Sequence, residues 1–177
     1  PEINDSVFRS LAVGDRFDVE GIPFATPQHG KNIAFVSLWD NYPSALTIPV
    51  KAQKASVAHI LLAGSTNHMQ THMDNAIIIA NYKDGTSDTL HLIPPFNYCP
   101  IEQDFYVDGK AFQTVEPRPV RICLATGTVS RNLGTALSIK SDEVYGREIP
   151  GGAAQLLSML LSPSKKLHSF TLIPLSN

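Results

Sequence analysis

The chain has 177 residues, the usual length of one domain, with 43% hydrophobic and 17% charged residues, as in globular proteins. A net charge of -2 at pH 7 and the lack of any Lys or Arg run exclude the electrostatic footprint of a nucleic-acid-binding protein. The longest apolar stretch, 156–161, is far too short to span a membrane.

The first residues carry no signal peptide, because they have neither a basic start nor an apolar core. A chain that begins with proline is expected to be processed or cut from a longer protein. We therefore treat residues 1–177 as a single domain and expect it to be a fragment of a larger protein.

The segment 32–50 predicts two half-buried strands around a polar and aromatic turn at Trp39–Pro43. Asp40 and Asn41 favour a turn because their side chains bond the local backbone, and Pro43 keeps Tyr42 out of the helical region. The turn should present its polar and aromatic side chains at one end of a sheet.

Two further segments predict the middle of the fold. Residues 55–66 form an almost continuous apolar run, which indicates a central strand covered on both faces, with Leu61 buried and His59 a hydrogen-bonded core histidine. Residues 76–82 and 86–92 flank Asp84-Gly85, which predicts a tight hairpin of the I′ type.

Residues 93–112 break every period and contain prolines, aromatics and carboxylates. A segment of this length without regular structure is typical of a functional loop or of one packed by its own aromatics. After it, 120–125 predicts a strand, 137–139 a short one, and 153–161 and 166–172 a closing pair. Residues 153–161 taken alone could be helical by propensity, but the β context and the short length favour a strand.

Many short strands without a long helix predict an all-β fold, an antiparallel β-sandwich of jelly-roll type. Ile78 and Leu124 should lie in its core.

The sequence contains no motif typical of a metal or cofactor site. His68 and His72 have the spacing of a helical zinc pair, but they lie in a predicted loop without the glutamate of that motif. Cys99 and Cys123 form no C-x-x-C motif, and Cys123 is expected to be a buried thiol rather than half of a disulfide. We expect no cofactor, although the acidic loop leaves calcium open.

The loop carboxylates Glu102, Asp104 and Asp108 allow three interpretations. They could form an acid–base pair of a glycosidase, cap turns, or bind calcium through oxygen ligands. No nucleophile elbow and no phosphate-binding glycine loop is present. We therefore assign no catalytic residue.

The loop aromatics suit stacking on a sugar ring, with neighbouring polar groups bonding the hydroxyls. For Trp39 taken alone, packing into one end of the sandwich core is favoured. If a ligand site exists, we expect it where three loops converge, with these members: Trp39, Asp40, Asn41, Tyr42, His68, His72, Glu102, Asp104 and Tyr106.

An ordered set of short motifs resembles the galactose-binding-like β-sandwich modules of bacterial glycoside hydrolases: 39–43, 47–50, 59–67 and 82–86. More narrowly, with 100–109 and 151–154, it is similar to the C-terminal β-sandwich of an uncharacterised glycoside-hydrolase family of gut Bacteroidetes. The similarity spans roughly residues 20–173. Members carry two aromatics before the position of Pro100, where this chain has Tyr98-Cys99.

The resemblance implies a non-catalytic accessory module that binds a glycan or polysaccharide, secreted or periplasmic, with a catalytic domain elsewhere in the same protein. Two alternatives stay open: a structural module that packs on the catalytic domain without binding glycan, and a glycoside hydrolase acting through the loop carboxylates. The resemblance gives no reason to expect turnover by this chain alone.

Overall fold

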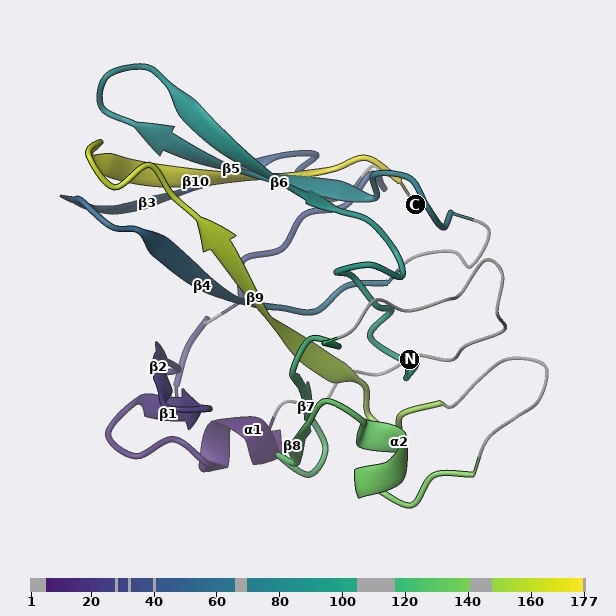
Figure 1. Cartoon of the computed structure of the whole chain (residues 1–177). Coiled ribbons are helices and arrows are strands. Elements are labelled where there is room, and N and C mark those ends of the chain that lie inside the picture. The colour runs from purple at the N-terminus through teal and green to yellow at the C-terminus, as the bar shows by residue number, and fades with distance from the viewer. Residues whose placement is uncertain are drawn as a thin grey trace.

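The computed structural model describes residues 6–27, 29–31, 33–39, 41–65, 70–104, 117–140 and 148–176. Its elements in chain order are α1 (Ser6–Ser10), β1 (Arg16–Val19), β2 (Ile22–Ala25), β3 (Leu46–Gln53), β4 (Val57–Leu62), β5 (Ala76–Tyr82), β6 (Ser87–Leu92), β7 (Arg121–Cys123), β8 (Val129–Ser130), α2 (Leu133–Ala136), β9 (Ala153–Leu160) and β10 (Leu167–Pro174) (Figure 1). No helix among the described residues is long and apolar enough to cross a membrane.

Two four-stranded antiparallel sheets make up the fold, and β1 pairs with β2 in a separate hairpin. The strand orders are β3-β10-β5-β6 and β4-β9-β7-β8. The chain passes from one sheet to the other four times, between β3 and β4, β4 and β5, β6 and β7, and β9 and β10 (Figure 1). The predicted all-β, antiparallel sandwich is confirmed, whereas the jelly-roll type stays a prediction.

Alternation along the strands builds the core between the sheets. On β5, Ile78, Ala80 and Tyr82 are buried, while the residues between them are only half-buried. They pack in one cluster with Leu157 and Met159 of β9 in the other sheet. Side chains at alternate positions of a strand share a face, so the same sequence pattern that forms each strand also fills the interior.

A second apolar cluster covers the other face of the β4-β9-β7-β8 sheet. Phe8 of α1 and Phe17 of β1 are in edge-to-face contact, with ring centroids 4.4 Å apart. They pack against Ile122 of β7 and Ala154 of β9. The helix and the β1–β2 hairpin thus form a third layer beneath this sheet (Figure 1).

The predicted hairpin is confirmed as β5 and β6, but its predicted turn type is wrong. Tyr82 accepts from the N–H of Gly85 and donates its own N–H to Thr86, and only Gly85 has a positive φ, of 83°. This is a three-residue loop with a glycine bulge rather than a I′ turn, in which Asp84 would also need a positive φ. Asp84 instead accepts from the Thr86 N–H and hydroxyl.

The place predicted for the apolar run 55–66 is wrong. Its strand, β4, lies at an edge of its sheet and has β9 as its one paired neighbour among the described strands. Leu61 is half-buried rather than buried, and His59 is exposed, with its Nδ1 3.0 Å from Ser158 Oγ. Ile78 and Leu124 are buried as predicted, at 4% and 6% exposure.

Two predicted strands are not formed. The described residues 33–38 before Trp39 contain no strand, and residues 137–139 follow α2 without extended pairing. Ile33 and Phe35 are exposed, so their alternation has no sheet face to cover. The predicted strands at 120–125, 153–161 and 166–172 are confirmed as β7, β9 and β10. The prediction that residues 93–112 lack regular structure is confirmed for the described part, 93–104.

Candidate functional site: an exposed aromatic loop

The segment between β2 and β3 forms a loop that is held together mainly by its own bonds. Ser37 donates its N–H to Pro43 O at 3.0 Å, and Tyr42 donates to Trp39 O at 3.0 Å. The Trp39 N–H is 3.2 Å from Ser37 Oγ. Phe35 supports the Tyr42 ring edge to face, with centroids 4.8 Å apart. The sequence therefore builds a compact turn that fixes Trp39 and Tyr42.

The aromatic rings of this loop face solvent. Trp39 is 71% exposed and Tyr42 is 53% exposed, so the expectation that Trp39 fills one end of the core is wrong. Asn41 between them is exposed as well. An indole costs free energy when it stays in water, and exposed clusters of large apolar side chains mark contact sites. Asp40 lies outside the described residues.

The second predicted loop contributes His72 to a different neighbourhood. The His72 N–H donates to Pro94 O at 2.7 Å, and its ring meets Phe96 edge to face, with centroids 4.9 Å apart. Its side chain is exposed, and its φ is 58°. His68 lies outside the described residues, so the predicted histidine pair cannot be placed. Among the described residues, no group of three His, Cys, Asp or Glu could hold a metal ion.

The third predicted loop holds its carboxylates inward. Asp104 is 2% exposed, and its Oδ2 accepts from the backbone N–H of Gly134 at 2.8 Å. Glu102 is half-buried, and its Oε2 is buried with no hydrogen-bond partner seen among the described residues. Asp104 therefore supports the first turn of α2 rather than a surface contact. Tyr106 and Asp108 lie outside the described residues.

A buried arginine anchors this carboxylate loop. Arg121 of β7 is 1% exposed, and its guanidinium donates to Gln103 O, to Pro100 O at 2.8 Å and to Ala153 O at 3.5 Å. A planar guanidinium with five donors can bridge several carbonyls at once. Arg121 thereby joins residues 100–103 to the start of β9 and fixes where the loop leaves the sheet.

Gln155 of β9 holds the preceding residues in the same way. Its Oε1 accepts from the Cys99 N–H at 3.0 Å, and its Nε2 donates to Asn97 O at 2.7 Å. Gln155 is 2% exposed, so the two bonds satisfy both polar atoms of a buried side-chain amide. Arg121 and Gln155 were not predicted as important, because a polar residue inside a strand gives no sign in the sequence of what it meets.

Both cysteines are buried and free. The Cys99 thiol donates to Gln103 O at 3.4 Å and accepts from Arg121 at 3.5 Å. Burial raises the pKa of Cys99 to about 12, against the opposing effect of Arg121. A thiol that stays protonated at neutral pH is a poor nucleophile and a poor metal ligand. The expected buried thiol at Cys123 is confirmed.

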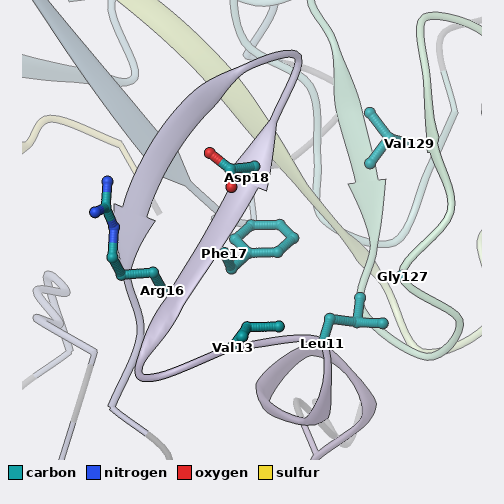
Figure 2. Close-up of a pocket in the computed structure, with 7 residues that line it drawn as sticks. All are labelled: Leu11, Val13, Arg16, Phe17, Asp18, Gly127 and Val129. Atoms are coloured by element: carbon teal, nitrogen blue, oxygen red, sulfur yellow. The ribbon is translucent and has the colours of Figure 1, made fainter.

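A shallow depression lies on the third layer, beside β1 (Figure 2). It encloses about 660 Å³ and is lined by Leu11, Val13, Arg16, Phe17, Asp18, Gly127 and Val129. Gly127 has a φ of +73°, at which any L side chain would be strained, and a Cβ there would come 2.2 Å from Leu11 Cδ1, so Leu11 would have to shift. Apart from the Arg16 and Asp18 side chains, its lining side chains are apolar. It was not foreseen, because its lining residues come from segments far apart in the chain.

The three predicted loops therefore offer different chemistry. The loop with Trp39 and Tyr42 is aromatic and exposed, His72 packs on Phe96, and Asp104 is enclosed. Of the predicted members that are described, Trp39, Asn41 and Tyr42 are the ones brought together on one exposed turn. Comparison with protein-family models, with curated proteins and with solved structures gives no match to this chain.

Proposed function

We propose that this chain is a non-catalytic β-sandwich module that binds a glycan or polysaccharide through the loop carrying Trp39 and Tyr42. It would serve a catalytic domain of a glycoside hydrolase in the same protein, in the periplasm or outside the cell. The proposal rests on the resemblance of the sequence motifs together with the geometry of this loop.

The observation that carries the proposal is the exposure of Trp39, at 71%. The apolar face of a pyranose ring stacks on an indole, and each aromatic contact of this kind removes apolar area from water. Tyr42, braced by Phe35, offers a second ring with a hydroxyl, and Asn41 offers amide donors and an acceptor for sugar hydroxyls. Rings held by a compact turn lose little conformational freedom on binding.

A second candidate function is that of a structural module that packs on its catalytic domain without binding glycan. It is favoured by two aliphatic residues beside the aromatics, Ile33 at 63% and Leu38 at 41% exposure. Sugar binding does not need them, whereas an interdomain interface would bury them. The two functions thus use the same loop for different partners.

Trp39 is the single tryptophan of the chain, so its fluorescence reports on this loop alone. Soluble xylan, β-glucan, galactan and mucin should be titrated against the chain, with affinity electrophoresis in the same polysaccharides as a second readout. Binding should shift and enhance the emission, because the indole leaves water. Tyr42→Ala should weaken binding about tenfold or more, in line with a lost ring contact worth roughly 1.4 kcal/mol.

The matched control is Phe96→Ala, which removes an aromatic that is 41% exposed on a different loop. Retained binding in this variant, with loss in Tyr42→Ala and Trp39→Ala, would assign the site to the aromatic loop. Binding that depends on Phe96 instead would move the site to the His72 loop. Glycan binding only by a protein that includes the catalytic domain would favour the structural module.

A further inference from the structure

We propose that the outer edge of β4, which has no strand partner among the described residues, is a dimerisation surface, on which β4 of a second copy of this chain pairs antiparallel about a two-fold axis. The pairing would join the β4-β9-β7-β8 sheets of two copies into one continuous sheet. The inference concerns a part of the molecule separate from the aromatic loop and does not depend on the proposed function.

The other edges of the two four-stranded sheets carry the usual protection against strand pairing, and β4 does not. β3 contains Pro49 and Lys51, β8 has only two residues, and β6 is rich in polar residues such as Asp88. Natural proteins block exposed edges with these features. β4 has six residues, VAHILL, without proline or a charged Asp, Glu, Lys or Arg. An edge without proline or such a charge can pair with another uncharged strand, and β4 of a second copy is such a strand.

The hydrogen-bond pattern tells which residues of β4 face the free edge. Leu161 donates its N–H to Ser56 O at 2.9 Å, in register with the β4–β9 pairs. In an antiparallel ladder, every second residue bonds to the same neighbour, so Ala58, Ile60 and Leu62 direct their backbone groups toward β9. Val57, His59 and Leu61 therefore direct theirs away from β9, toward the open edge.

Of the two-fold registers open to this edge, the one with its axis at His59 pairs all three of these residues. A two-fold axis through His59 places it opposite His59 of the second copy, and Val57 opposite Leu61 of the second copy. Every N–H and C=O of the three residues then finds a partner, because each such pair exchanges two hydrogen bonds. A strand whose edge groups match themselves in this way needs no other protein to complete it.

The side chains of this edge add apolar surface on the outer face of the sheet. Val57 lies opposite Leu160 in the β4–β9 register, and the two are 36% and 80% exposed. The pairing would bring the Val57 of each copy beside Leu61 of the other. Cross-strand pairs of branched aliphatic residues stabilise antiparallel sheets. The exposed Val57 of β4 is thus placed where it would contact Leu61 of the second copy.

Sedimentation equilibrium of the isolated chain over a range of concentrations tests the proposal. We expect a monomer–dimer equilibrium in the wild type and a monomer in His59→Lys and in His59→Pro. The proline removes an N–H that points to the free edge and leaves the β4–β9 ladder intact. Gln53→Lys places the same charge on exposed β3 and should leave the dimer unchanged. Circular dichroism and thermal unfolding of each variant check that it folds.

Cysteine cross-linking tests the register. In the proposed pairing, the Cα atoms of the two His59 residues lie about 5.5 Å apart, within the range of a disulfide. His59→Cys should form a covalent dimer under mild oxidation. The two natural cysteines should not cross-link the copies, because both are buried. Val57→Cys should not, because the two Val57 residues are offset by four positions, more than about 13 Å along the strand.

A wild type that stays monomeric at its highest soluble concentration would overturn the proposal. A dimer that survives both His59→Lys and His59→Pro would also overturn it, because another surface would then hold the copies together. Efficient cross-linking through Val57→Cys but not His59→Cys would contradict the two-fold axis at His59.

Discussion

The Oδ2 atom of Asp104 accepts a hydrogen bond of 2.8 Å from the backbone N–H of Gly134, a residue 30 positions later in the chain. Both residues are buried. The first N–H groups of a helix have no partner within the helix, so a carboxylate from elsewhere satisfies one of them and interacts well with the helix dipole. Asp104 thus ties the carboxylate loop to α2.

Asp104→Ala should therefore destabilise the protein without needing any catalytic role. Loss of the acceptor leaves the Gly134 N–H buried and unpaired, at a cost of about 1–3 kcal/mol in the free energy of unfolding. Asp104→Asn should lose less, because the amide keeps an acceptor oxygen. Urea unfolding followed by circular dichroism measures both. Equal stability of Asp104→Ala and wild type would show that the bond does not hold the loop.

Leu156 and Leu160 test the third layer, because they lie on the same face of β9. Leu156 packs against the cluster formed with α1 and β1, whereas Leu160 is 80% exposed. Leu156→Ala should cost about 2 kcal/mol, at the low end for core truncation because the side chain is partly covered. Leu160→Ala should change the monomer's stability by less than about 0.5 kcal/mol.

The measurement is urea unfolding at a protein concentration where the chain is monomeric. A similar loss in both variants would mean that Leu160 is also covered in the monomer. A negligible loss in Leu156→Ala would mean that the helix and hairpin do not pack on this face of the sheet.

Asp88 of β6 is bonded to Tyr82 at the end of β5 and to Ser162 in the connection between β9 and β10. The ionisation of this carboxylate makes the free energy of unfolding depend on pH. The hydrogen bond from the Tyr82 hydroxyl, together with those from the Ser162 hydroxyl and N–H, lowers the pKa of Asp88. A carboxylate with a lowered pKa in the folded state stabilises the fold above its unfolded pKa, about 3.9. That stabilisation is lost as the pH falls through the folded pKa.

The free energy of unfolding should thus fall as the pH is lowered below about 4. Asp88→Asn should reduce the slope of this fall, and Tyr82→Phe, which removes the first donor, should also reduce it. Some slope should persist in both variants, because hydrogen bonds from Thr86 lower the pKa of Asp84 as well. An Asp88→Asn variant with the full wild-type slope would contradict the role given to this carboxylate.

Local patterns in the sequence predicted those parts of the fold that local chemistry decides. The β5–β6 hairpin follows from Asp84-Gly85 and the alternation around it, and β9 was predicted as a strand in spite of good helix formers. The edge position of β4 did not follow. Its apolar residues cover both faces because Leu61 meets the third layer while Ile60 meets the sandwich core. The apolar pattern of β4 does not tell whether a strand pairs with it on one side or on both, so the sequence could not place it at the edge of its sheet.

The candidate site shows the same division. The turn chemistry of Asn41 and Pro43 predicted a turn at Trp39–Pro43, and the Tyr42 N–H donates to Trp39 O at 3.0 Å within it. The alternation before Trp39 wrongly predicted a strand, because Ile33 and Phe35 have the period of a strand but no sheet to pack on. The inward turn of Asp104 depends on Gly134, a contact between distant segments that no local pattern reveals.

The two cysteines should be unreactive in the folded protein. Cys99 and Cys123 are 5% and 1% exposed, and burial raises the pKa of Cys99 to about 12. Because thiolates are the reactive form, a disulfide-exchange reagent at pH 8 should modify neither thiol at the rate of an exposed cysteine. In denaturant, both should react at once. The expected difference in rate is at least a hundredfold, because Cys99 would ionise far less than a free thiol of pKa about 8.5.

Cys99→Ser and Cys123→Ser identify which thiol reacts. Rapid modification of Cys99 in the native chain would mean that the loop around Arg121 opens readily, and that the carboxylate loop is not held as described.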